Sequence, residues 1–253
     1  MIYRSIQSDG HLIIFVHGFN GSACGTWIQF PDRIVGNPIF QGSDVVYFGY
    51  DGLRQQAQDS ANIFYDYINE LISNPLDGVQ DFILPLLERK QPFSYKRITL
   101  VGHSLGAVII RLAMLTAHKE QKPWLKLCEL VFYAPAHMGS RITQLVSETL
   151  LGIPYVAGAG GIAKWRLKVL NDLEEKSELL NLLRQRTEKA SRSAPQLRAR
   201  AIVVTKKENV VINTEFLEDD PHPSRIDSAT HITICKPRSD CEEPAKFLYA
   251  NVK

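Results

Sequence analysis

The sequence predicts an α/β protein with a mostly parallel central sheet, helices on both faces and a helical cap insertion. Short apolar runs alternate with longer segments of helical periodicity, a pattern typical of strands that are covered on both faces. The interval from Ala134 to Leu197 is longer than a simple crossover between strands needs, so it is expected to hold an insertion. At 253 residues, with 45% hydrophobic and 22% charged residues, the chain is long enough to bury one large core.

The individual elements follow from the same pattern. Strands are expected where short, almost continuously apolar runs occur, at residues 12–16, 44–48, 97–101, 130–133 and 200–205. Helices are expected where apolar residues recur every three or four positions, at residues 55–72, 79–89, 105–118, 142–151, 164–189 and 244–251. We see no internal repeat or low-complexity linker, so we expect a single domain over residues 1–253 with the cap at about 141–196.

The charge balance argues against a nucleic-acid partner. The formal net charge is +2, which gives no strong electrostatic footprint for a polyanion. The one local excess of basic residues lies between Arg184 and Arg200. Its simplest interpretation is a solvated helix face and loop, and an anionic surface partner is the alternative.

The cysteines argue against a metal site, and the apolar stretches argue against a transmembrane segment. Cys24, Cys128, Cys235 and Cys241 form no C-x-x-C pair, so no metal site is expected. The N-terminus lacks the pattern of a signal peptide, and residues 150–163 are too short and glycine-rich to span a bilayer. We therefore expect a cytoplasmic protein without a transmembrane segment, and leave open a peripheral contact with a membrane or lipid interface.

The stretch "ITLVGHSLGAVIIR" contains the strongest chemical signal. Its segment from Gly102 to Gly106 matches G-x-S-x-G, which a random chain of this length contains about one time in ten. The context is more specific than the motif, because Ser104 lies between a predicted strand and a predicted helix. A sharp turn there would expose the hydroxyl at the carboxyl edge of the sheet, next to the free N–H groups of a helix N-terminus. The stretch therefore predicts a nucleophilic serine, with a structural serine cap as the alternative.

A second stretch, "LIIFVHGFNG", predicts the partner of this turn. An oxyanion hole needs two N–H donors. One would be Leu105, directly after the serine, and the other would be Phe19, in the loop that follows an earlier strand. We expect His17 to hold that loop by hydrogen bonding rather than to take part in the chemistry.

Two further stretches complete a resemblance to a known family. They are "YAPAHMGS" from Tyr133 to Ser140 and "HITICKP" from His231 to Pro237. With the two stretches above, they resemble a lipase-like serine esterase of the α/β-hydrolase family, most closely the branch of GPI inositol-deacylase-like and related lipid-metabolising hydrolases. The resemblance implies the α/β-hydrolase fold and a hydrolase with no metal or organic cofactor. It also implies that the loop with His137 and Met138 lines the substrate pocket.

The serine needs a base and an acid. The chain order of this fold, serine then acid then histidine, requires a late histidine. Among the seven histidines, His231 is the predicted base, and His222 is the alternative. Glu208 is the predicted acid, because it follows a strand at a point where similar sequences carry Asp or Glu. The alternatives are a purely surface role for that glutamate and an acid that lies later in the chain, at Asp227, Asp219 or Asp220.

These features predict a serine hydrolase that cleaves carboxylic esters through an acyl-enzyme on Ser104. The inserted sequence "LLGIPYVAGAGGIA" is apolar, which favours a lid over an acyl pocket and hence a lipid or medium-to-long acyl ester as substrate. An acyltransferase or thioesterase could use the same triad. A non-catalytic binding module of the same fold is the competing interpretation from another class.

Overall fold

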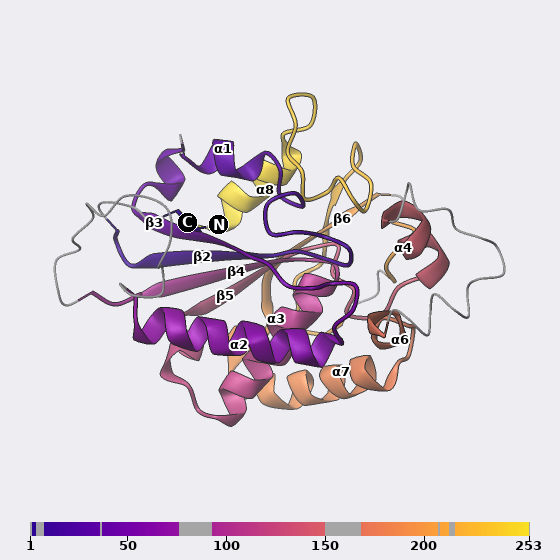
Figure 1. Cartoon of the computed structure of the whole chain (residues 1–253), viewed down its shortest axis with the longest axis horizontal. Helices are drawn as coiled ribbons and strands as arrows, with labels where there is room; N and C mark the ends of the chain where they lie inside the picture. Colours follow the sequence, from indigo (N-terminus) through magenta and orange to yellow (C-terminus); the bar gives the residue numbers. More distant parts are fainter. Residues whose placement is uncertain are drawn as a thin grey trace.

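One twisted sheet forms the centre of the protein (Figure 1). The computed structural model describes residues 2–3, 8–35, 37–75, 93–149, 168–206, 208–212 and 216–252. Within these ranges the strands lie in the order β1-β3-β2-β4-β5-β6-β7. Their bounds are β1 Ile2–Tyr3, β2 His11–Val16, β3 Ser43–Phe48, β4 Arg97–His103, β5 Cys128–Tyr133, β6 Ala199–Thr205 and β7 Ser224–Ile226. Only β1 runs antiparallel to its neighbour, and the other pairs of neighbouring strands are parallel.

Helices cover both faces of this sheet. The α-helices are α1 Phe30–Val35, α2 Ala57–Ser73, α3 Leu105–Lys119, α4 Ile142–Thr149, α6 Val169–Asp172, α7 Glu178–Ser191 and α8 Glu243–Asn251. Short 3₁₀ helices are η1 Pro38–Phe40, η2 Pro123–Leu127 and η3 Pro195–Leu197. In Figure 1, α1 and α8 lie on one face, and α2, α3 and α7 lie on the other, with α3 packed against both α2 and α7. No helix in the described part of the chain is both long and apolar enough to cross a membrane.

The apolar runs form the strands that their composition predicts. Every residue of β2 and β3 is buried, as expected for strands that are covered on both faces. The five predicted strands are confirmed, with ends that differ by a few residues. Strands β1 and β7 were not predicted, because strands of two or three residues are too short to show a period in the sequence.

The predicted helix 164–189 is wrong as one element. The structure divides its described part into α6 and α7, separated by residues 173–177. Lys176 adopts a positive φ of 62°, and the hydroxyl of Ser177 accepts a hydrogen bond from the N–H of Leu180 to begin α7. The predicted helix 79–89 and the apolar stretch 150–163 lie outside the described residues. Within the predicted cap, α7 packs against α3 in the helix layer, so the cap itself remains a prediction.

The parallel register brings several loops to one edge of the sheet. Val16 at the end of β2 pairs with Gly102, and His103 at the end of β4 pairs with Tyr133. Tyr133 in turn pairs with Val203 of β6. The carboxyl ends of four neighbouring strands therefore meet, and the segments that leave them carry most of the predicted site residues. In open α/β sheets this edge is where ligands bind.

Candidate active site

Ser104 forms a strained turn between β4 and α3. Its backbone has φ 51° and ψ −116°, a conformation that L-residues rarely adopt. Close packing on both sides requires glycine: a Cβ on Gly102 would lie 2.8 Å from the backbone N of Ala107, and one on Gly106 would lie 2.2 Å from the carbonyl oxygen of Val16. These contacts fix the serine at the carboxyl edge of the sheet, as the motif predicts.

His231 lies next to this serine, although 127 positions separate them in the chain. Its Nε2 is 3.1 Å from the Oγ of Ser104, and both side chains are buried. At this distance the imidazole can accept the hydroxyl proton.

The carboxyl of Glu208 lies on the other side of the imidazole. Its Oε1 is 3.3 Å from the Nδ1 of His231, an ion-pair distance at which the N–H is not yet aligned for a hydrogen bond. The same oxygen accepts hydrogen bonds from the backbone N–H groups of Val210 at 2.9 Å and Val211 at 3.1 Å, and the hydroxyl of Thr205 lies 3.4 Å from Oε2. Burial alone would raise the pKa of the Glu208 carboxyl, but His231 and these two N–H groups outweigh it and hold the pKa below its usual value. The carboxyl is therefore ionised at neutral pH.

The other acid candidates have different surroundings. Asp227 is exposed and pairs with Lys206 at 2.9 Å, and Asp219 is exposed and pairs with Arg198 at 2.7 Å. The side chain of Asp220 is buried, and its carboxylate accepts hydrogen bonds from Arg111 at 2.6 Å and from the N–H of Ala199 at 2.7 Å. His222, the alternative base, has an exposed side chain. The structure therefore brings only Glu208 and His231, of these candidates, to the serine.

The loop after β2 is held in place by His17 and Tyr50. The backbone N–H of Tyr50 donates to the Nε2 of His17 at 3.3 Å, so the proton of this imidazole is on Nδ1, which donates to the carbonyl of Gly18 at 2.9 Å. The Tyr50 hydroxyl donates to the carbonyl of His17 at 2.7 Å, and the two rings stack 4.2 Å apart. Burial lowers the pKa of His17, which keeps the ring neutral. No motif or spacing in the sequence points to Tyr50, a single tyrosine two residues after the end of β3.

This loop lies directly against the nucleophile. A Cβ on Gly18 would be 3.0 Å from the Cβ of Ser104, so Phe19 follows a backbone in contact with the serine. Leu105 begins α3 immediately after Ser104. The two predicted oxyanion donors therefore come from adjacent segments at the same edge of the sheet.

His103 links three parts of the site. Its Nε2 donates to the backbone carbonyl of His231 at 2.9 Å, and a Cβ on Gly18 would lie 3.0 Å from its Nδ1. Burial, followed by the charge of His231, lowers the pKa of His103 well below its usual value, so the ring is neutral. The residue beside the nucleophile thus fixes the backbone of the histidine loop, a role that the sequence motif does not reveal.

The predicted pocket residues lie in the loop after β5. His137 is buried between the rings of Phe132 and Phe216, with centroids 5.0 and 4.6 Å away, and burial lowers its pKa well below the usual value. With Met138 it lines a cavity of about 140 Å³ that also includes Ile212 from the segment after Glu208. Among the residues that the structure describes, no cluster of three or more His, Cys, Asp or Glu side chains could hold a metal ion.

The sequence matches a known family over most of its length. A family model described as "Putative serine esterase (DUF676)" matches residues 7–214. The chain belongs to this family. No curated protein matches the sequence of this DUF676 member. The description of this family is that of serine esterases, enzymes that hydrolyse carboxylic esters.

Solved structures of α/β-hydrolases share the fold of this DUF676 protein. The mature lipase BlEst2 of Bacillus licheniformis matches with a TM-score of 0.60 and 14% identity over 99% of this chain and 96% of the lipase. A peroxisomal α/β-hydrolase of Saccharomyces cerevisiae matches with a TM-score of 0.55 and 12% identity, over 98% of this chain and 75% of its own. Phospholipase PlaB of Legionella pneumophila matches with a TM-score of 0.52 and 20% identity over 78% of this chain, which corresponds to 39% of PlaB. The expected α/β-hydrolase fold is therefore confirmed.

Proposed function

We propose that this protein hydrolyses lipid or medium-to-long-chain acyl esters through an acyl-enzyme on Ser104. The observation that carries the proposal is the relay of three side chains, with Ser104 Oγ 3.1 Å from His231 Nε2 and His231 Nδ1 3.3 Å from Glu208 Oε1. This is the arrangement in which a histidine activates a serine and a carboxylate holds the histidine.

In the proposed reaction, the Oγ of Ser104 attacks the ester carbonyl carbon while its proton moves to the Nε2 of His231. The tetrahedral intermediate then collapses, the C–O bond to the alcohol breaks, and His231 gives the proton to the leaving alcohol. A water molecule, deprotonated by the same nitrogen, next attacks the acyl carbonyl carbon. The C–O bond to Ser104 then breaks, His231 returns the proton to the Oγ, and the acid leaves and ionises to the carboxylate. The ionised carboxyl of Glu208 stabilises the imidazolium in both halves of the reaction.

The backbone N–H groups of Phe19 and Leu105 are proposed to stabilise the oxyanion. Removing one such donor typically costs about 10²- to 10³-fold in turnover. The bonds that His17 and Tyr50 make to the loop backbone support a hole that is already formed before substrate binds. No step in this scheme needs a metal ion or an organic cofactor.

Two observations support an acyl ester with a chain longer than acetyl. Residues 150–163 are apolar and glycine-rich in sequence. Two of the structural neighbours are named a lipase and a phospholipase.

The test measures kcat/KM on p-nitrophenyl esters from acetyl to dodecanoyl. Each buried methylene contributes about 0.8 kcal/mol, so half-burial of the four methylenes between butanoyl and octanoyl predicts a rise on the order of tenfold. A steady fall from acetyl upward would contradict the acyl pocket and indicate a small-substrate esterase.

A further inference from the structure

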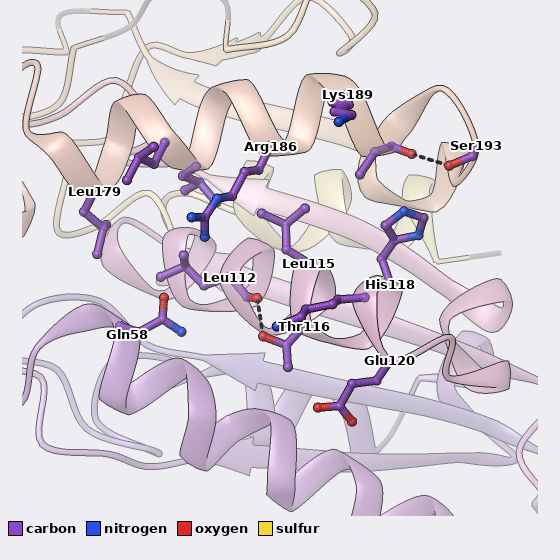
Figure 2. A pocket seen from close by; sticks show the side chains of 14 residues that line it. Gln58, Leu112, Leu115, Thr116, His118, Glu120, Leu179, Arg186, Lys189 and Ser193 are labelled. Atoms are coloured by element: carbon purple, nitrogen blue, oxygen red, sulfur yellow. Dashed lines mark hydrogen bonds between the residues drawn. The ribbon is translucent and has the colours of Figure 1, made fainter.

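A groove on this protein lies away from the catalytic residues. It has a volume of about 830 Å³, within the size range of small-molecule sites, and lies between α2, α3 and α7 on the side of α3 that faces away from the sheet (Figure 2). Its lining on α3 begins at Leu112, eight residues after Ser104 and therefore about 12 Å along the helix. The groove is thus separate from the predicted acyl pocket.

One half of the groove is mostly apolar. Its walls there are leucines of the outer face of α3 and the first half of α7, namely Leu112, Leu179, Leu182 and Leu183. Gln58 of α2 lies at the same end, and Leu115 lies nearer to His118 (Figure 2). Leu182 is 38% exposed, one of the few large apolar side chains within the described ranges that face water to this extent. Apolar side chains on both walls of a groove provide a surface along which a hydrocarbon chain can be shielded from water.

The other half of the groove is positively charged. Figure 2 shows Leu179 at one end and His118, Lys189 and Ser193 at the other, with Arg186 between them. The only acidic residue in the described lining is Glu120, which accepts a hydrogen bond from the hydroxyl of Tyr65 and pairs with Lys122.

An adjoining depression of about 690 Å³ extends this positive end. It shares His118, Lys119 and Ser193 with the groove and adds Lys122 and Lys126. The helix dipole alone accounts for basic residues in the last turns of α3 and α7. It does not account for Arg186, which lies in the middle of α7, nor for the apolar half.

We propose that this groove binds a single-chain anionic amphiphile. The negative head group would lie among Lys119, Lys189 and His118, and the hydrocarbon tail along the leucines of α3 and α7. Charge complementarity selects against a neutral ester at the head-group end, and the apolar half distinguishes the site from a general anion site. The inference extends the proposed function, because a long-chain carboxylate is what lipid-ester hydrolysis releases, but binding in the groove does not require turnover.

The test titrates dodecanoate, below its micelle concentration, into protein whose active-site serine has been capped with a long-chain fluorophosphonate. Intact mass reports the capping separately, so a failure to cap counts against the esterase proposal and not against the groove. We expect one dodecanoate per protein, at least tenfold weaker binding of dodecanol and of acetate, and weaker binding at high salt. Lys189→Glu and Leu182→Glu should each weaken binding at least tenfold.

Matched controls lie outside the groove. Lys246→Glu changes the net charge equally on α8, and Ile63→Glu replaces another exposed apolar side chain, on α2. Both should bind dodecanoate within twofold of the unaltered protein. The proposal is wrong if Lys189→Glu and Leu182→Glu bind as the controls do, if acetate competes as well as dodecanoate, or if capping the serine removes the binding.

Discussion

Replacing Glu208 by glutamine tests the least obvious member of the site, and the structure sets the size of the effect. The oxygen of Glu208 that faces His231 is the same Oε1 that accepts the N–H groups of Val210 and Val211. The amide oxygen of a glutamine can keep all three contacts, and its NH₂ group then faces the hydroxyl of Thr205. The variant should therefore keep the productive tautomer of His231 and lose only the negative charge.

The cost of that charge follows from the distance. Opposite charges about 4 Å apart attract by about 4 kcal/mol at an effective dielectric constant of about 20, which is an upper bound for a site that can relax. We expect Glu208→Gln to lose about 10²- to 10³-fold in kcat with little change in KM. This is less than the loss of about 10⁴ seen in a triad where the amide imposed the wrong tautomer.

The assay is steady-state hydrolysis of p-nitrophenyl octanoate, with thermal unfolding to verify that the variant folds. Asp227→Asn is the matched control, because Asp227 is exposed and pairs with Lys206 at the surface. A Glu208→Gln variant that keeps more than a tenth of wild-type kcat would refute the reasoning. Loss of activity in Asp227→Asn instead would move the acid to that later position.

Other predictions follow from neighbouring contacts. Ser104→Ala should reduce turnover on the order of 10⁶-fold without unfolding the protein, and residual activity of a few per cent would exclude this nucleophile. His103→Phe, which removes the donor to the carbonyl of His231, should lower kcat about 10- to 100-fold at unchanged KM, and His103→Gln should recover most of it; equal kcat in both variants would exclude this positioning role. Burial, followed by the charge of Arg97, lowers the pKa of His11 to about 3. As the pH falls, His11 is therefore protonated near pH 6.5 in the unfolded chain but only near pH 3 in the folded chain. The free energy of unfolding should therefore fall as the pH drops through this window, by up to about 1.4 kcal/mol per pH unit from this group. Chemical denaturation at a series of pH values should show a weaker dependence of the free energy of unfolding on pH for His11→Gln than for the wild type.

The turn that carries Ser104 could be predicted from the sequence because its residues are neighbours in the chain. Gly102, Ser104 and Gly106 lie within five positions, and the structure shows that each glycine touches backbone where a Cβ would clash. His231 was predicted from its position late in the chain and from the resemblance of the stretch around it to the family. Both predictions needed only residue type and order.

The acid could not be selected in the same way. Glu208 competed with three aspartates of the following loops, and residue type alone does not separate them. Only their partners do: Asp219 and Asp227 pair at the surface, and Asp220 pairs with the buried Arg111. Such contacts depend on the tertiary fold, which the sequence pattern does not report.

The helix break at residues 173–177 could not be predicted from the periodicity of the apolar residues. Leu173 and Leu180 are seven positions apart, which is two helical turns, so the stripe of leucines continues in phase across the break. The signal that could have shown the break is the serine at position 177 with an acidic residue after it, a helix start inside the periodic run.

The central claim is that Ser104 is a nucleophile activated by His231, and active-site labelling tests it most directly. Folded protein is treated with a fluorophosphonate probe, and the modified residue is mapped by mass spectrometry. The account predicts stoichiometric modification of Ser104 and at least a hundredfold slower labelling in His231→Ala, because the imidazole 3.1 Å away would no longer take the hydroxyl proton. A folded protein left unmodified at Ser104, or one that labels equally fast without His231, would contradict it.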